Sequence, residues 1–218
     1  MMIYLGADGG IPEVSKEEII GRAEAVLKKC RLDNEILVDI ETVCDALCVN
    51  ILPVADLFRC FHIDAFISAD FRTIYVDEGE FRKSSPRYRF SVAHELGHFV
   101  LHRDYYPSGV SGLREWVDAS CDLLSAWAEN QANCFAGNLL VPEDKLIQIL
   151  NNEFGGSFAR NYWNASPAEF ECIFARVGKK FMVSEQVILR RMQDIFPGVG
   201  RDIYYIVNNN WRSYVNKK

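Results

Sequence analysis

The spacing of apolar residues in the first fifty positions predicts two amphipathic helices. The first begins at residues 15–18, Ser-Lys-Glu-Glu, which have the pattern of a capping box. The second is expected from Asp39 to about Cys48. Cys44 and Cys48 fall on the apolar face of this second helix, which predicts buried thiols that act as small hydrophobes before they act as ligands. The apolar stripe of the first helix consists of Ile19, Ile20, Ala23, Val26, Leu27 and Cys30.

Three short strands are predicted between residues 49 and 77. Residues 49–54 form the first, in which Pro53 favours an edge or an end of a sheet. Residues 65–68 and 73–77 flank a turn, an arrangement typical of a hairpin. The strand at 73–77 precedes a histidine-rich helix, so it could bind an extended peptide by strand addition at its edge. Alternatively, this strand only supports the sheet.

A strongly apolar helix is predicted after Pro86, and its polar residues have the most specific pattern in the chain. His94-Glu95-Leu96-Gly97-His98 places two imidazoles on one helical face, about 6 Å apart along the axis. Two such histidines can bind one zinc ion, and Glu95 beside it can take a proton from a water. A chance match on an amphipathic helix is the alternative. Buried polar groups need partners, however, and a metal would serve all three. The apolar residues around them are Phe90, Val92, Ala93, Leu96, Phe99, Val100 and Leu101.

His102 is an apparent third histidine ligand, but helical geometry argues against it. On a continuous helix it would lie about 12 Å from His94 along the axis, whereas each metal–nitrogen bond is only about 2 Å long. Phe99, Val100 and Leu101 include no glycine or proline that would break the helix. His102 is therefore expected to support a ligand or to have a structural role.

The best candidate for the third ligand is Glu129. It lies four residues before Asn133, so a helix would place a carboxylate and an amide on one face. The carboxylate could bind zinc, and Asn133 could hold the free ring nitrogen of a ligating histidine. Ala132 and Ala136 would allow this helix to pack closely against the histidine helix. Glu and Asn on a helix usually form only a solvated face, and Cys134 falls on a different face from Glu129.

The C-terminal part predicts two further helices with helix-turn-helix spacing. Ser166 caps one that runs to about Val177, and Ser184 caps another that runs through Ile195. Residues 176–218 contain nine Lys and Arg against three Asp and Glu, so this segment is basic within a chain of net charge −6. It could bind nucleic acid or an acidic partner. The favoured interpretation is that Ile188, Leu189 and Met192 pack while the basic residues form the solvated side.

Length and composition are those of a compact intracellular enzyme. The 218 residues are 49% hydrophobic, enough to form a core for one domain or one domain with an appendage. No apolar run approaches the roughly 20 residues of a membrane helix, and no secretory signal is visible, so a cytoplasmic location is expected. Seven cysteines without a CxxC pair argue against a disulfide framework.

Two blocks of the sequence, residues 87–102 and 129–142, resemble the ImmA/IrrE family of metallopeptidases and occur in the family's order. The resemblance implies His94, His98 and Glu129 as zinc ligands and Glu95 as the catalytic base. It also implies a cytoplasmic bacterial protein that cleaves helix-turn-helix repressors of the Xre type and so derepresses genes of a phage, mobile element or stress locus. The sequence departs from the family at Val141, which stands where methionine usually precedes the proline, and at residues 103–128, which match no recognised segment.

The sequence therefore predicts an α+β fold, mostly helical with a small sheet, and a minimal gluzincin-like metallopeptidase core at residues 1–160. A basic helical extension at 161–218 would pack on the same domain. One Zn²⁺ per chain is expected, and Tyr105 and Tyr106 are candidates for the oxyanion donor that the chemistry requires. The alternatives are a non-proteolytic DNA-binding or sensory regulator with a structural zinc site, and one half of a toxin–antitoxin module.

Overall fold

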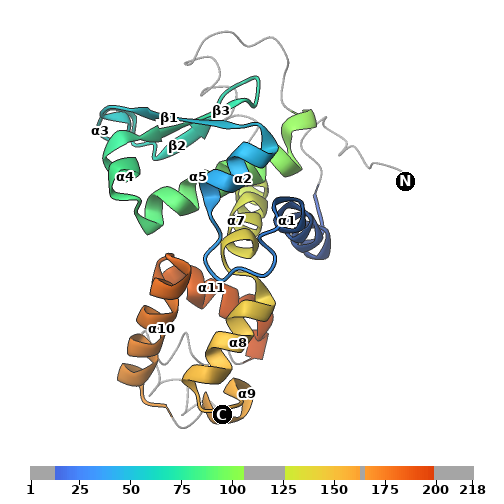
Figure 1. Cartoon of the computed structure of the whole chain (residues 1–218), viewed down its shortest axis with the longest axis vertical. Helices are drawn as coiled ribbons and strands as arrows, with labels where there is room; N and C mark the ends of the chain where they lie inside the picture. The colour runs from blue at the N-terminus through green and yellow to red at the C-terminus, as the bar shows by residue number, and fades with distance from the viewer. Residues whose placement is uncertain (1–12, 106–125, 163–164, 199–218) are drawn as a thin grey trace. The chain divides into compact units, whose positions relative to one another are not determined.

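The computed structural model describes residues 13–105, 126–162 and 165–198 (Figure 1). The chain forms two compact units, one made of Met1–Asn34 and Val38–Leu139 and the other of Glu35–Leu37 and Leu140–Lys218. Helices and a three-stranded sheet together make the α+β fold that the sequence predicts. In the described ranges, no helix has both the length and the apolar character needed to cross a membrane. The division into domains at residue 160 stays a prediction.

The first unit begins with the two predicted helices, α1 (Lys16–Cys30) and α2 (Ile40–Leu47). Ser15 Oγ accepts a hydrogen bond from the Glu18 amide at the start of α1, and the Asp39 carboxylate caps α2. Most of the predicted stripe of α1 is buried, namely Ile19, Ala23, Val26 and Leu27. These residues form the apolar face through which α1 packs in its unit.

The prediction of two buried cysteines in α2 is wrong for one of them. Cys44 is buried, and burial raises the pKa of its thiol to about 12. Cys48 is exposed because the helix ends at Leu47 and Cys48 adopts a left-handed conformation with φ of 58°. That turn of the backbone takes its side chain off the apolar face. All six cysteines among the described residues are free thiols.

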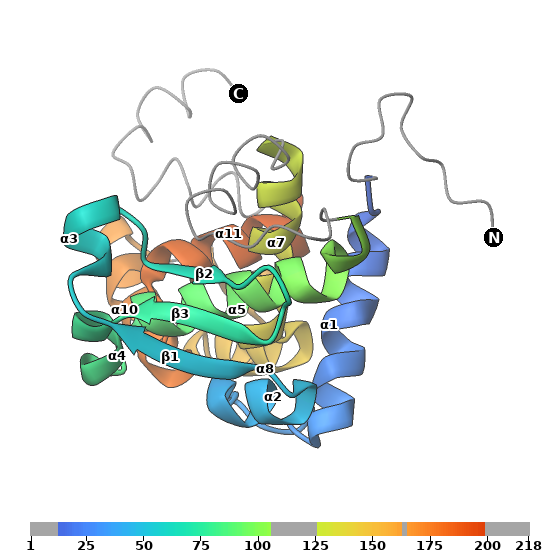
Figure 2. The ribbon, with the colours of Figure 1, turned by 90° about the horizontal axis from the view of Figure 1, so that it is seen from above.

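The sheet has the order β1-β3-β2, with β1 (Asn50–Val54) parallel and β2 (Ala65–Ile67) antiparallel to β3 (Thr73–Asp77). The predicted hairpin and the edge position of Pro53 are both confirmed. Burial alternates along β3, where Ile74 and Val76 are buried. Helix α5 packs against β2 and β3 of this sheet (Figure 2). The proposal that β3 offers a free edge is wrong, because β1 and β2 occupy both of its edges. The edge strands are β1 and β2.

Two short helices of this unit were not predicted, α3 (Leu57–Phe61) and α4 (Glu78–Lys83). Asp77 explains both, because its carboxylate accepts from the amides of Gly79 and Glu80 at the start of α4 and from the amide of Phe58 in α3. The chain then enters α5 (Pro86–Leu101), and the 3₁₀ helix η1 (Arg103–Tyr105) follows it. The last helix of the unit is α7 (Ala126–Leu140).

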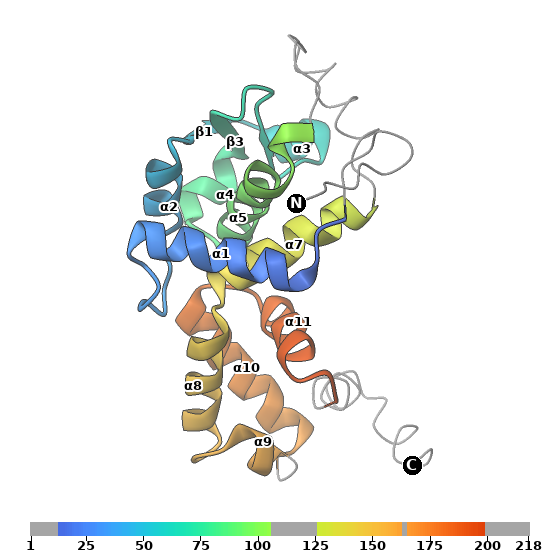
Figure 3. The same ribbon diagram turned by 90° about the vertical axis from the view of Figure 1, so that its right-hand side faces the viewer.

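The second unit is formed by α8 (Glu143–Glu153), α9 (Phe158–Asn161), α10 (Pro167–Phe181) and α11 (Glu185–Ile195), as Figure 3 shows. Its core contains a row of contacting aromatic rings that includes Phe154, Phe158, Phe170 and Phe174. The predicted cap at Ser166 is confirmed and forms a capping box with Glu169, and Ile188, Leu189 and Met192 are buried as predicted. The predicted cap at Ser184 is wrong, because its side chain makes no capping hydrogen bond with α11.

Helix α10 is longer than predicted, since it continues through Gly178 and ends at Phe181. Gly178 does not end the helix. A β-carbon there would lie 2.9 Å from the Val183 carbonyl oxygen, so glycine lets the turn before α11 fold closely against α10. Met182 makes that turn in the left-handed region, with φ of 50°.

Candidate metal centre

Helix α5 supports the site. Ser85 Oγ accepts from the Tyr88 amide at its N-terminus, and Pro86 occupies a first-turn position where no amide hydrogen is needed. The Tyr88 hydroxyl contacts Glu41 on α2 at 2.8 Å, and the Arg89 guanidinium donates to the Val38 carbonyl at 2.7 Å. These contacts fix α5 against the start of α2.

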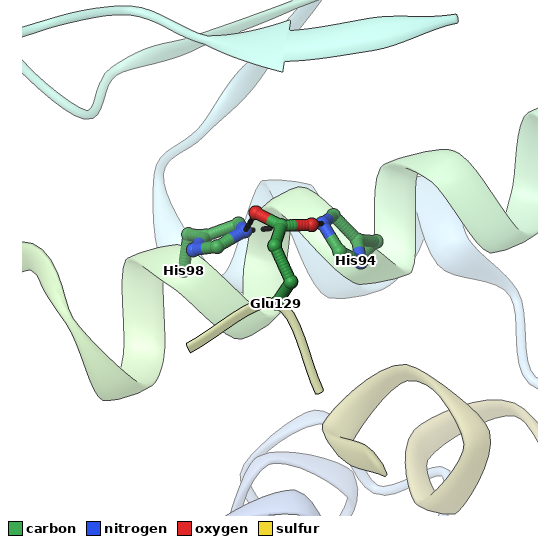
Figure 4. Close-up of side chains that lie close together, drawn as sticks. All are labelled: His94, His98 and Glu129. Atoms are coloured by element: carbon green, nitrogen blue, oxygen red, sulfur yellow. Dashed lines mark hydrogen bonds and ion pairs between the residues drawn. The ribbon is translucent and has the colours of Figure 1, made fainter. Parts of the chain in front are cut away.

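The structure brings His94, His98 and Glu129 together in one cluster (Figure 4). The two Nε2 atoms of His94 and His98 are 3.0 Å apart. Glu129 Oε2 lies 3.1 Å from His94 Nε2, and Oε1 lies 3.3 Å from His98 Nε2. Potential ligand atoms of three residues from two helices therefore converge on one point.

Close packing of α7 on α5 allows Glu129 to reach the histidines. A β-carbon at Gly97 would lie 3.0 Å from both the Cα and the carbonyl oxygen of Ala132. This distance is shorter than most contacts of a β-carbon, so glycine lets the two helices approach closely, and Ala132 is fully buried. The expectation that small residues let α7 pack closely against the histidine helix is confirmed at Ala132. Because Glu129 lies one turn before Ala132, this approach positions its carboxylate over the histidine face of α5.

Asn133 lies where a ligating histidine would need a partner. Its Oδ1 atom is 3.0 Å from Nδ1 of His94. A carbonyl oxygen can only accept, so Nδ1 of His94 carries the proton of a neutral ring and Nε2 keeps its lone pair. The amide thus directs the free nitrogen of His94 towards Glu129 and His98.

His102 is not part of the ligand cluster. It is fully buried as the C-cap of α5, with Nδ1 3.0 Å from Nδ1 of His98 and Nε2 3.0 Å from Oε1 of Gln131. The uninterrupted helix up to Leu101 explains why it cannot join His94. Gln131 was missed by sequence reasoning. The only available signal was that a buried imidazole needs hydrogen-bond partners, which does not say where the partner lies.

The three ligand atoms fit a divalent metal ion. A tetrahedral ion with bonds of about 2.0–2.1 Å requires ligand atoms roughly 3.3 Å apart. The two histidine nitrogens are 3.0 Å apart, and each lies 3.1–3.3 Å from one of the two oxygens of Glu129. With neutral histidines in the orientation described, two nitrogen lone pairs and a carboxylate would face one another. Such an arrangement is unfavourable without a cation or a proton between the atoms.

The electrostatics of the cluster also favour a cation or a proton between the ligand atoms. Hydrogen bonds with His94 and His98 hold the pKa of Glu129 well below its usual range. Burial opposes protonation of His94, but its hydrogen bond with Glu129 and the charges of Glu95 and Glu129 raise its pKa overall. Without a metal, a proton can therefore occupy the position between the ligands, and metal binding would release it.

Glu95 lies between the sheet and the cluster. Its Oε2 accepts a hydrogen bond of 3.0 Å from the Ile67 amide at the end of β2. Burial raises the pKa of the Glu95 carboxyl, against the opposing effects of His94 and His98. A raised pKa suits a carboxylate that accepts and returns a proton near neutral pH.

Two other sequence predictions fall outside the cluster. Cys134 on α7 is not among its ligand atoms, and its sulfur contacts the Asn138 amide at 3.6 Å. Tyr105 ends η1 directly after the histidine helix, while Tyr106 lies outside the described residues. The role of either tyrosine as an oxyanion donor stays a prediction.

Comparison with known families agrees with the geometry. Residues 56–193 match the metallopeptidase family Peptidase_M78, described as the IrrE N-terminal-like domain. The match includes all the residues of the cluster and most of the chain. A comparison with curated proteins gives no match. The chain belongs to the ImmA/IrrE family of metallopeptidases.

Proposed function

We propose that this protein is a zinc-dependent metalloendopeptidase in which His94, His98 and Glu129 bind one zinc ion and Glu95 is the catalytic base. The convergence of two histidine nitrogens and one carboxylate at separations of 3.0–3.3 Å carries the proposal. Two nitrogens and one carboxylate are a ligand set typical of catalytic zinc, which keeps a further position open. When bound, the ion supplies Lewis-acid chemistry, activating a water and polarising a carbonyl.

The residues of the chain provide the remaining chemistry. Glu95 accepts a proton from the attacking water and returns it to the leaving amine as the peptide bond breaks. Asn133 and His102 hold the outer nitrogens of the two histidines, so that the inner nitrogens face the open centre.

The edge strand β2 is the element best placed to bind the substrate. It uses one edge to pair with β3, and the Ile67 amide on β2 contacts Glu95. An extended peptide added to the other edge of β2 would run beside the proposed base. This replaces the expectation that β3 would accept the peptide.

The proposed substrate is a helix-turn-helix repressor of the Xre type, cleaved in the cytoplasm to derepress genes of a phage, mobile element or stress locus. Family membership supports a protein substrate. The choice of a repressor follows from the resemblance described above.

The deciding experiment compares the unmodified chain with Glu95→Gln. Each protein is loaded with one equivalent of zinc and incubated with the repressor encoded next to its gene, and intact masses are recorded. We expect cleavage only by the unmodified chain, with equal zinc contents in both proteins. Absence of bound zinc in the unmodified chain, or equal cleavage by both, would refute the proposal.

A further inference from the structure

A buried row of three polar side chains leads away from the ligand cluster. His98 Nδ1 lies 3.0 Å from His102 Nδ1, and His102 Nε2 lies 3.0 Å from Gln131 Oε1. The exposed fractions of His98, His102 and Gln131 are 3%, 0% and 6%. Bulk water therefore has little access to these atoms. Each of the two contacts consequently needs one donor and one acceptor from the protein itself.

The amide oxygen of Gln131 determines which nitrogen donates and which accepts in each hydrogen bond of this row. Because Oε1 can only accept, His102 Nε2 must carry a proton, and Nδ1 of a neutral His102 is then an acceptor. This acceptor takes the hydrogen bond from Nδ1 of His98. The single ring proton of His98 therefore lies on Nδ1, and its Nε2 keeps a lone pair towards His94 and Glu129.

If both hydrogen bonds ran in the opposite direction, His98 could not bind a metal ion. If the Gln131 amide were rotated, its NH₂ group would donate to His102 Nε2, and His102 Nδ1 would carry the proton. His98 Nδ1 would then accept, which would move the proton of His98 to Nε2. A protonated Nε2 cannot bind a metal ion.

We propose that Gln131 and His102 are positioning residues that fix His98 in the tautomer that carries its proton on Nδ1 and none on Nε2. The inference rests on the proposed metal centre and adds Gln131 to it, a residue that is 29 positions from His102 and contacts its imidazole. Removing a hydrogen-bond partner of a ligating histidine typically weakens metal binding by about 10- to 100-fold.

A matched pair of substitutions at Gln131 separates this role from simple packing. Gln131→Glu keeps an acceptor and removes the donor, so only the metal-compatible direction remains. Gln131→Leu has a similar size but neither group. Gln186→Leu, at an exposed position in the first turn of α11, controls for the change of residue type.

The first readout is the zinc affinity of the full-length chain, measured by competition with a chromophoric chelator. We expect Gln131→Leu to weaken binding at least tenfold. Gln131→Glu should equal or exceed the unmodified chain, and Gln186→Leu should stay within twofold of it. A merely structural role predicts instead that Gln131→Leu lowers the melting temperature of the metal-free protein with less than a threefold change in affinity. That result, or equal losses in both Gln131 variants, would overturn the proposal.

The second readout needs neither metal nor activity. Nitrogen-15 chemical shifts of the histidine rings in the metal-free chain at pH 8 report which nitrogen carries the proton. The proposal requires a proton on Nδ1 of His98 and on Nε2 of His102, and an unprotonated Nδ1 of His98 overturns it. If these tautomers and the affinity changes are found but no cleavage occurs, only the proposed peptidase function fails.

Discussion

A β-carbon added to Gly97 would lie 3.0 Å from the backbone of Ala132, so a side chain at this position would require α5 and α7 to move apart by a few tenths of an ångström. We expect Gly97→Ala to destabilise the protein by about 1–2 kcal/mol. The overpacking cost of about 1–3 kcal/mol exceeds the gain in helix propensity of up to about 1 kcal/mol. Zinc affinity should also fall, because the shift of α7 moves Glu129. Chemical denaturation and chelator competition measure the two effects.

Gly21 provides the matched control for this substitution. It lies within α1, and an added β-carbon there would have no neighbouring atom within 4 Å. Gly21→Ala should therefore stabilise the protein by about 0.5–1 kcal/mol through helix propensity alone and leave zinc affinity unchanged. If Gly97→Ala behaved like Gly21→Ala, the close approach of the two helices would not be needed for the site.

Asn133 should affect metal binding through the acceptor that it offers to His94. Asn133→Leu removes the oxygen 3.0 Å from His94 Nδ1, and we expect zinc affinity to fall by about 10- to 100-fold. Asn133→Asp keeps an acceptor at a similar position and should retain most of the affinity. Isothermal titration with zinc measures both variants. Equal losses for leucine and aspartate would contradict the role assigned to the oxygen.

Asp77 connects two helices to the sheet, and its contribution to the free energy of unfolding should depend on pH. Hydrogen bonds from the Phe58 amide and from the amides at the start of α4 lower the pKa of its carboxyl, against a smaller opposing effect of burial. Asp77→Asn loses one of the two acceptor oxygens. We expect a loss of about 1–2 kcal/mol in unfolding free energy at pH 7.

The sign of the pH effect follows from the lowered pKa. A carboxylate with a depressed folded-state pKa adds stability above its unfolded value, about 4, and this contribution is lost as pH falls through the folded value. The stability difference between the unmodified chain and Asp77→Asn should therefore shrink below about pH 4. Urea denaturation between pH 3 and pH 7 measures it. Asp104→Asn, at an exposed carboxylate beside Arg103, should change stability by less than about 0.5 kcal/mol throughout.

Local periodicity was sufficient to predict the part of the site that lies on one helix. His94, Glu95 and His98 are within a single uninterrupted helix, so their relative positions follow from helical geometry. The exclusion of His102 from the ligand cluster follows from the same geometry. Glu129 required a second segment, which the need for a third ligand and the family resemblance together supplied.

Contacts between distant segments could not be predicted in this way. The hydrogen bond from Ile67 to Glu95 and the contact of Gln131 with His102 depend on how β2 and α7 pack against α5. No periodic pattern within one element specifies that packing. Cys48 shows a related failure, since one left-handed residue at the end of α2 moved it off the face that the periodicity assigned. Helices α3 and α4 are only five and six residues long, too short to give a periodic signal.

The basic C-terminal segment gives the final prediction, which distinguishes a peptidase from a DNA-binding regulator. Four of its cations already have structural roles within the second unit. Arg176 pairs with Glu153 at 2.8 Å, and the buried Arg191 donates to the Val141 carbonyl at 3.1 Å. Lys179 and Lys180 occupy the last turn of α10, where positive charge stabilises the helix end.

We therefore expect the double variant Lys179→Glu, Lys180→Glu to lose thermal stability without a change in DNA affinity. Binding of the full chain to a 30-base-pair duplex is measured by gel shift at 50 and 200 mM salt. Neutralising two phosphate contacts would change the slope of log affinity against log salt by about 1.8, since each contact contributes about 0.9. A steep salt dependence in the unmodified chain that the double variant reduces by this amount would favour the DNA-binding regulator. Unchanged weak binding in both proteins agrees with helices whose basic side is only solvated.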